Sequence, residues 1–196
     1  TQSHSGTSSL KIAVTSGYTG GAMVIATPTD LSGYTALTFW AKNDNPAFKL
    51  DGVGIGNNAA TTKYAVERNG VTLTSGWVKY YIPLPVPSKL TAETGLFHFA
   101  EGSGEGAYNI WIDDIQYENV SSAILGVPTA AFATETISRP VGETFTPNGT
   151  VSVYPVCAEG AMQTARAYFT WSSTNNAVAS INADGLGAAV AAGRRL

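Results

Sequence analysis

Cysteine and charge are both scarce in this sequence. Cys157 is the only cysteine among 196 residues, which excludes an intrachain disulfide and a zinc site built from cysteines. Charged residues make up 13% of the chain, about half of the usual share. The net charge is −3 and the only basic cluster is Arg194-Arg195, so we do not expect a nucleic acid as a partner.

Long apolar runs are missing as well. No stretch of about 18 apolar residues is present, so we expect no insertion into a membrane. Residues 1–9 lack the charged and apolar parts of a signal peptide. The sequence stops on Gly-Arg-Arg-Leu directly after an apolar stretch. We therefore expect the chain to be an excised piece of a longer protein.

No segment has the periodicity of an amphipathic helix. Up to about residue 120, apolar residues recur at every second position in short runs, as in strands with one face on a core and the other in solvent. The predicted strands are residues 9–14, 23–27, 36–43, 48–56, 63–68, 77–84, 96–100 and 108–118. Eight such strands indicate a double-sheet sandwich, so the predicted fold class is all-β.

Turn-forming residues separate these strands. Asn69-Gly70 is the strongest hairpin signal among them, because both residues tolerate the positive φ of a tight turn. Pro83, Pro85 and Pro87 alternate near the end of the strand at 77–84. Since proline cannot donate to a ladder, these residues should end that strand or place its tail at a sheet edge.

The pattern changes after residue 118. A short linker at 119–127 runs straight into a first strand, and further strands are predicted at 144–153, 167–171, 177–181 and 186–191. We predict two domains, residues 1–121 and 122–196, of which the second is too short for a complete seven-stranded sandwich.

Four stretches of the first domain resemble the jelly-roll carbohydrate-binding modules attached to bacterial polysaccharide-degrading enzymes. They are residues 4–11 (HSGTSSLK), 37–42 (LTFWAK), 76–84 (GWVKYYIPL) and 108–115 (YNIWIDDI). The resemblance implies a β-sandwich jelly roll of the galactose-binding type. Modules of this fold bind different sugars and some bind none, so the resemblance supports the architecture more directly than a ligand.

The second domain resembles the group 2 bacterial immunoglobulin-like domains. The matching stretches are residues 141–143 (VGE), 171–173 (WSS), 178–181 (VASI), 184–185 (DG) and 191–193 (AAG). The resemblance implies an immunoglobulin-like β-sandwich that serves as a spacer or an adhesive stalk. The family normally continues into a final strand, so we expect the domain to be incomplete at its C-terminus.

Asp113 and Asp114 are the candidate metal ligands. In the jelly rolls that the first domain resembles, an acidic residue of the last strand commonly binds a structural calcium together with oxygens from the start of the domain. Calcium prefers six to eight oxygen ligands, and carboxylates on an otherwise apolar strand are costly to bury unless paired or coordinated. The alternative is that both residues straddle a bulge and face solvent or cap a turn.

Aromatic side chains supply candidate carbohydrate contacts, because flat rings stack on the apolar face of pyranose rings while polar groups bond the hydroxyls. If Phe39, Tyr80, Ile82, Ile110 and Ile112 point inward, alternation places their neighbours outward. The candidates chosen in this way are Trp40, Tyr81, Asn109 and Trp111. His98 is a further candidate, because alternation points it away from the side of Phe97 and Phe99. Trp77 is a candidate that can lie on either face. The alternative is that loops or the second domain cover these rings.

A second candidate surface is a groove between two strands. Its floor would be small residues and its rim charged ones, with Tyr64 projecting into it if the register is shifted. The groove would consist of Gly54, Gly56 and Asn57 beside Lys63, Ala65 and Glu67. An ordinary solvated strand face is the simpler interpretation of the same pattern.

Catalysis has little support in the sequence. Asp113 and Asp114 are adjacent and would point to opposite sides of a regular strand, so they cannot flank a glycosidic bond as an acid and base pair. His4 and His98 are the only histidines and lack metal-ligand spacing. No Gly-x-Ser-x-Gly elbow is present. We therefore expect a non-catalytic protein.

The leading hypothesis is an extracellular bacterial carbohydrate-binding module with an immunoglobulin-like spacer. It would hold a secreted enzyme or a surface protein on a polysaccharide such as a β-glucan, xylan or mannan. The alternative is a structural module of a surface adhesin, stalk or filament. In that case a neighbouring protein could donate a strand to an open sheet edge.

Overall fold

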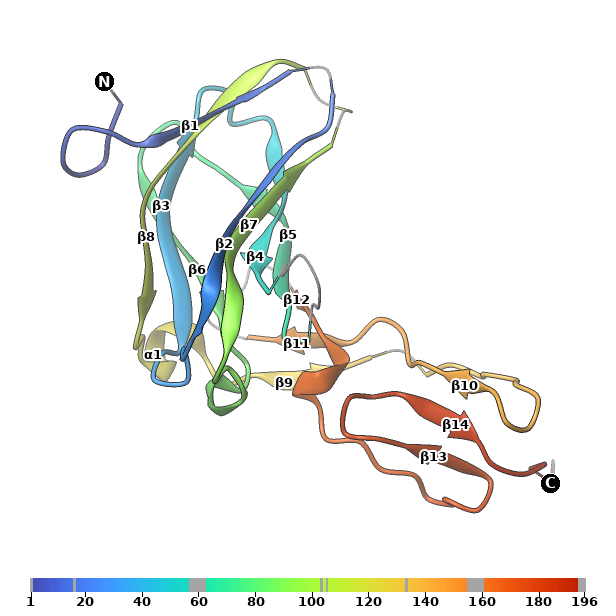
Figure 1. Ribbon diagram of the computed structural model, residues 1–196. Coiled ribbons are helices and arrows are strands. Elements are labelled where there is room, and N and C mark those ends of the chain that lie inside the picture. The colour runs from blue at the N-terminus through green and yellow to red at the C-terminus, as the bar shows by residue number, and fades with distance from the viewer. Residues whose placement is uncertain are drawn as a thin grey trace.

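The computed structural model describes residues 2–15, 17–56, 63–102, 104, 106–132, 134–154 and 161–193. Asn57 and Cys157 lie outside these ranges. The described residues form three β-sheets with one short α-helix, which confirms the all-β prediction. Figure 1 shows a tall sandwich that carries the N-terminus, and a smaller arm that ends at the C-terminus.

One layer of the sandwich is a four-stranded antiparallel sheet with the order β1-β8-β3-β6. Its strands are β1 (Leu10–Val14), β3 (Ala36–Asn43), β6 (Val78–Pro83) and β8 (Tyr108–Glu118). The predicted bounds of β3 and β8 match the structure. Pro83 ends β6, as the prolines predicted, and Pro87 begins the 3-10 helix η1 (Pro87–Lys89).

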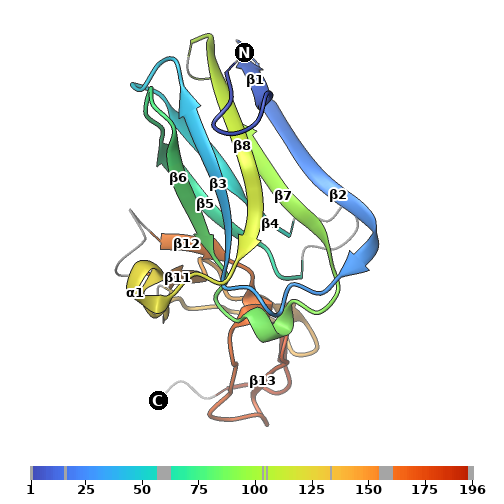
Figure 2. The same ribbon diagram turned by 90° about the vertical axis from the view of Figure 1, so that its left-hand side faces the viewer.

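The facing layer begins with the order β2-β7-β4-β5. Its strands are β2 (Thr19–Thr29), β4 (Lys49–Ile55), β5 (Val66–Thr72) and β7 (Glu93–Glu101). Two antiparallel sheets with these strand orders form an eight-stranded jelly roll. Figures 1 and 2 show the two layers face to face along the height of the sandwich.

Alternation along the strands produces the core between the layers. Phe39, Ile82 and Ile110 are fully buried, and Phe39 stacks on Tyr80 with ring centroids 5.7 Å apart. The inward orientation predicted for these residues is therefore confirmed. Burial of large apolar side chains contributes about 1.5–3 kcal/mol each and dominates the stability of such a sandwich.

Asn69-Gly70 is not a hairpin, and this prediction is wrong. Both residues lie inside β5, and Gly70 has a φ of 64°. The ladder with β4 pairs Leu50 with Val71 and Gly52 with Asn69, so the register is the same on both sides of Gly70. Glycine accepts a positive φ within a strand as readily as in a turn, so the dipeptide does not by itself reverse the chain.

Strands from beyond residue 121 extend the second layer of the jelly roll to seven strands. After the single helical turn α1 (Ser122–Leu125), the strands β9 (Thr129–Ala131), β11 (Val151–Val153) and β12 (Ala161–Thr164) continue the order as β5-β12-β11-β9. Met162 is fully buried in the same core cluster as the jelly-roll residues. The sandwich and the following segment thus share one sheet and one core, and the division at 121/122 stays a prediction.

A third sheet forms the far arm of the molecule. It has the order β10-β14-β13, with β10 (Thr144–Phe145), β13 (Ala179–Ile181) and β14 (Gly187–Ala189). The strand predicted at 144–153 is split into β10 and β11. The strand predicted at 167–171 is wrong, because the 3-10 helix η2 (Arg166–Tyr168) occupies that position and buries the adjacent Ala167 and Tyr168.

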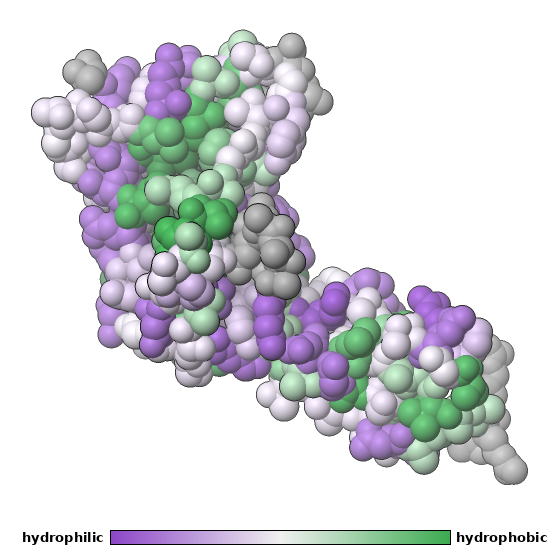
Figure 3. All heavy atoms as spheres, viewed as in Figure 1, coloured by the Kyte–Doolittle hydropathy of each residue, from purple (hydrophilic) through white to green (hydrophobic). Residues whose placement is uncertain are grey.

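The surface mixes polar and apolar side chains over both parts of this bent molecule (Figure 3). Exposed large apolar residues include Met23 and Val24 on β2, and Val141, Leu186 and Val190 on the arm. Among the described residues, no helix has the length and apolar character needed to cross a membrane.

Candidate functional site

The predicted binding residues fall on two different surfaces of the sandwich. Trp40, Tyr81, Asn109 and Trp111 belong to the four-stranded sheet, Trp77 directly precedes β6, and each of the five is half-buried. We call the outer surface around the three tryptophans the tryptophan face. His98 lies on β7 of the opposite sheet.

Lysine side chains pack against the rings of the tryptophan face. The ladder places Trp111 between Lys11 of β1 and Lys42 of β3. The Nζ atoms of these lysines lie 5.7 and 5.3 Å from the centroid of the Trp111 ring, and Lys42 is also 5.3 Å from the Trp77 ring. These are cation–π distances, so the rings already have partners within the protein.

The N-terminal segment covers a further ring of this face. The imidazole of His4 stacks on the indole of Trp40 with a centroid separation of 3.7 Å and an interplanar angle of 11°. His4 also approaches Trp77 edge-on at 6.0 Å. The imidazole thus lies on an indole surface where a sugar ring would otherwise stack.

A bulge in β8 brings Asp113 and Asp114 to the same N-terminal segment. The ladder with β3 shifts between Thr38 and Trp40, and Asp114 has a φ of 48°. Asp113 Oδ2 accepts hydrogen bonds from the backbone N–H groups of His4 and Ser5. Both carboxylates therefore bind the same N-terminal segment, although a regular strand would have placed them on opposite sides of the sheet.

The Asp114 carboxylate is held by the side chains of that segment. Ser5 Oγ donates to Oδ1 at 2.6 Å, and His4 Nδ1 lies 2.7 Å from Oδ2. The hydrogen bond from Ser5, followed by that from His4, lowers the pKa of Asp114 below its ordinary value of 3.8. The ionised form is the one that these bonds stabilise.

The donor set around these carboxylates does not fit calcium as it stands. Asp113 Oδ1 accepts the Asp114 N–H, so all four carboxylate oxygens have hydrogen-bond partners. No group of three or more acidic, histidine or cysteine side chains among the described residues could hold a metal ion. A calcium ion would have to displace the His4 and Ser5 donors, and its binding stays a prediction.

Asn109 is also engaged within the protein. Its backbone N–H and its side-chain amide donate to the two carboxylate oxygens of Asp44 at 2.8 and 2.7 Å. These two bonds lower the pKa of Asp44. Asn109 therefore ties β8 to the loop that follows β3.

On the opposite sheet, His98 meets Glu67 across a glycine. His98 of β7 and Glu67 of β5 are both paired with Gly54 of the intervening strand β4. The Nε2 atom of His98 lies 2.9 Å from Glu67 Oε2. The carboxylate also lies over Gly52, where an added Cβ would be only 3.2 Å from the Glu67 Cδ atom. Glycines at 52 and 54 thus leave the space that this pair occupies.

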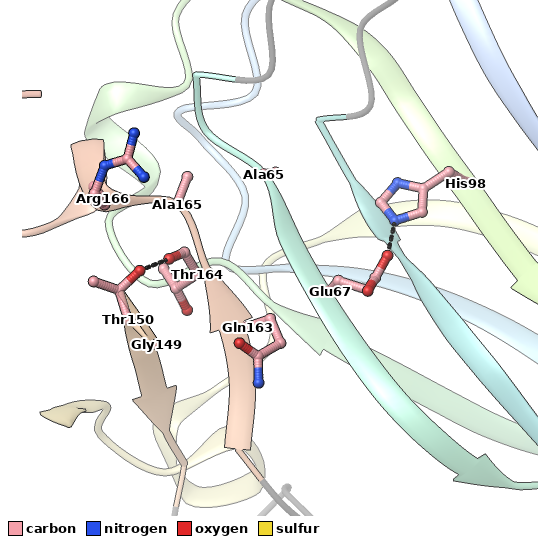
Figure 4. Close-up of a pocket in the computed structure, with 9 residues that line it drawn as sticks. All are labelled: Ala65, Glu67, His98, Gly149, Thr150, Gln163, Thr164, Ala165 and Arg166. Atoms are coloured by element: carbon pink, nitrogen blue, oxygen red, sulfur yellow. Dashed lines mark hydrogen bonds and ion pairs between the residues drawn. The ribbon is translucent and has the colours of Figure 1, made fainter. Parts of the chain in front are cut away.

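One row of paired residues crosses the whole seven-stranded sheet on this surface. It runs through Ala22, His98, Gly54, Glu67, Gln163, Val151 and Ala131. Around its middle lies a cavity of about 390 Å³, which we call the hollow. Figure 4 shows Glu67 and His98 on one side of it and Gln163, Thr150 and Arg166 on the other. Of the predicted groove residues, Ala65 and Glu67 line this cavity, whereas Gly54, Gly56 and Lys63 are not among its lining residues and Asn57 lies outside the described residues.

An exposed tyrosine stands over the same surface. Tyr18 has a relative exposure of 72%. Its side chain lies over Gly20, because a Cβ added at Gly20 would be only 2.5–2.9 Å from the hydroxyl and ring atoms of Tyr18. Gly20 pairs with Ala100 and Ala22 with His98, so Gly20 shares the face of the hollow. The alternation pattern missed Tyr18 because it precedes β2, although the two glycines that follow it signal a close approach.

Tyr64 lies at the junction of the two parts of the chain. Its ring meets the ring of Tyr168 at 5.4 Å, and its carbonyl accepts a hydrogen bond from the Tyr168 hydroxyl at 2.9 Å. Burial of Tyr168 raises the pKa of its hydroxyl. Tyr64 therefore holds η2 against the sandwich.

Sequence patterns also missed Gln163, Arg166 and Thr150. Strand β12 has four residues and is too short for a detectable period, and η2 was interpreted as a strand. Thr150 Oγ1 donates to the Thr164 carbonyl, and Thr164 Oγ1 donates to the Met162 carbonyl. Neither hydroxyl is placed as a nucleophile, and the hollow has Glu67 as its single acidic side chain among the described residues.

Comparison with known proteins identifies one segment. Residues 150–195 match the family model described as bacterial Ig-like domain (group 2). No curated protein and no solved structure matches the chain. Domains of this group are typically non-catalytic and occur in bacterial surface or extracellular proteins. The match supports the immunoglobulin-like part of the sequence prediction, and carbohydrate binding by the jelly roll stays a prediction.

Proposed function

We propose that this protein is a non-catalytic carbohydrate-binding module that acts outside the cell, and that it binds polysaccharide at the hollow. The observation that carries the proposal is the combination of an exposed ring, a cavity of about 390 Å³ and a polar pair on one sheet face. Tyr18 supplies the ring, and the Glu67–His98 pair supplies the polar groups at the cavity. β-glucan, xylan and mannan are the expected ligand classes.

The chemistry of sugars suits this combination. Pyranose rings offer an apolar face for stacking and a rim of hydroxyls for hydrogen bonds. Glu67 and Gln163 lie opposite each other on neighbouring strands and present carboxylate and amide groups to that rim. A shallow site of this kind is expected to bind with micromolar to millimolar affinity.

The tryptophan face is a weaker candidate for the same role. Its rings contact His4, Lys11 and Lys42, and a sugar would have to replace those contacts. We propose the hollow as the principal site and assign the tryptophan face to the packing of the N-terminal segment.

A pull-down on insoluble polysaccharides tests the proposal. We expect retention on one polysaccharide class, with binding weakened about tenfold by Tyr18→Ala and by Glu67→Gln. Tyr34→Ala is the matched control, because Tyr34 is an exposed tyrosine that packs against Tyr117 instead. Retention that falls with Trp40→Ala but not with Tyr18→Ala would move the site to the tryptophan face.

The second candidate function is a structural module of a bacterial surface protein. The continuous sheet favours it, because β5 and β12 join the sandwich to the segment that matches the immunoglobulin-like family. A fixed junction of this kind suits a spacer. Failure to bind any polysaccharide, together with concentration-dependent oligomers in sedimentation, would favour this role and a strand-exchanging protein partner.

A further inference from the structure

The hollow is built jointly by the jelly roll and the segment beyond residue 121. Glu67 and His98 come from the sandwich, whereas Thr150, Gln163 and Arg166 come from the second segment. Three register pairs join β5 to β12, and the Ala165 N–H donates to the Ala65 carbonyl at 2.9 Å. Neither part of the chain forms this cavity alone.

Two buried polar atoms of the residues lining the hollow have no hydrogen-bond partner. They are Nδ1 of His98 and Nε of Arg166. His98 is only 6% exposed, so its Nδ1 atom carries a desolvation cost that the described residues do not offset. Two of the residues that line the hollow thus hold a polar atom that the described part of the protein does not satisfy.

One cationic side chain at the hollow has no acidic partner among the described residues. Glu67 pairs with His98, and the nearby Lys63 pairs with Asp184 at 3.1 Å. The Arg166 guanidinium forms no ion pair with an acidic side chain among the described residues, and its Nε atom has no hydrogen-bond partner among them. Arginine presents paired N–H donors that match the geometry of a carboxylate.

We propose that the hollow binds a sugar unit that carries a carboxylate, a uronic acid, with Arg166 as its anion-binding residue. The proposal rests on the function proposed above; among the ligand classes expected there it favours xylan that carries uronic acid, and it extends them to other acidic polysaccharides. Gln163 and the Glu67–His98 pair bond the hydroxyls of the same unit. A cavity of about 390 Å³ falls within the range of small-ligand sites.

Carboxyl reduction provides a direct test, because it converts each uronic acid to its neutral sugar without changing the backbone of the polymer. Polygalacturonate, glucuronoxylan and alginate are each compared with their carboxyl-reduced derivatives by affinity electrophoresis. We expect at least one acidic polymer to bind about tenfold or more tightly than its reduced form.

Variants assign this preference to Arg166. Arg166→Met keeps the aliphatic stem and removes the charge, and it should abolish the difference between acidic and reduced polymer. Arg139→Met is the matched control, because Arg139 is exposed and bonds only the Ser138 carbonyl. Gln163→Ala, at an exposed position, should weaken binding of both forms severalfold and serves as a second variant if Arg166→Met does not fold.

The outcomes separate the two proposals. Equal or tighter binding of the reduced polymers, or an unchanged preference in a folded Arg166→Met variant, would overturn the acidic-sugar inference and leave sugar binding standing. If the Tyr18 and Glu67 variants retain full binding as well, the site is elsewhere. Failure to bind all acidic and neutral polymers would overturn both proposals.

Discussion

The two outer faces of the sandwich are built by the same alternation of side chains, but one is covered by the protein's own side chains and the other carries a cavity. On the tryptophan face, large rings point outward and the protein covers them with its own lysines and His4. On the other face, the Glu67–His98 pair lies over Gly52 and Gly54, and the hollow opens between this pair and the residues of the second segment. Outward aromatic residues thus indicate packing partners as readily as a ligand site, whereas the cavity forms where two parts of the chain meet.

The largest expected effect comes from adding a side chain at Gly54, beneath the Glu67–His98 pair. A Cβ at Gly54 would lie 2.0 Å from the Val66 carbonyl oxygen, so β4 and β5 would have to separate. Gly54→Ala should lower the free energy of unfolding by about 3 kcal/mol, measured by urea denaturation. Gly33→Ala is the control, since nothing lies within 4 Å of its added Cβ. Equal stability of both variants would contradict this account of the close approach between β4 and β5.

A smaller effect is expected from uncovering the tryptophan face. Trp40→Ala removes the ring on which His4 stacks and should cost about 1 kcal/mol of stability. Retention on polysaccharide should stay unchanged. A loss of binding comparable to that of Tyr18→Ala would reverse the assignment of the two faces.

Acid should release the N-terminal segment from that face. Since the pKa of Asp114 is lowered in the folded protein, its contribution is complete above about pH 4 and is lost as the pH falls through the folded value. Tryptophan fluorescence between pH 5 and pH 2 should report the loss of the His4 contact. Asp114→Asn removes this titration, and Asn tolerates the positive φ of this position. An identical pH profile in that variant would assign the change to another group.

The smallest expected effect is that of calcium. Because N–H and O–H donors occupy all four carboxylate oxygens of Asp113 and Asp114, we expect calcium and a chelator to give melting temperatures within about 1 °C of each other. A rise of several degrees with calcium, lost in Asp113→Asn, would instead establish the metal site implied by the family resemblance.

Local alternation was sufficient to predict the strands and the direction of most side chains. Phe39 and Trp40, or Ile110 and Trp111, fall on the expected sides because period two is a property of the strand itself. Asp113 and Asp114 escaped the rule because a bulge breaks the period. Gly70 shows a different limit, since a glycine with a positive φ lies here inside a strand and not in a turn.

The arrangement of the hollow could not be predicted in the same way. Glu67 and His98 are 31 residues apart and meet only because β4 inserts between their strands. Gln163 joins them through a register between two parts of the chain that no local pattern fixes. Ala65 and Glu67 of the predicted groove do line the cavity, but the wall supplied by β12 is a long-range feature.

The ladder between β5 and β12 also has a mechanical consequence. Its register pairs, the Ala165–Ala65 hydrogen bond and the Tyr168–Tyr64 hydrogen bond act in parallel with the covalent linker around residue 126. Tension applied between the N-terminal strands and the far arm is therefore carried by the sheet itself, and the linker bears load only after these bonds break. The junction should therefore be mechanically stiff. The first rupture under tension, the separation of β5 from β12, would also open the hollow.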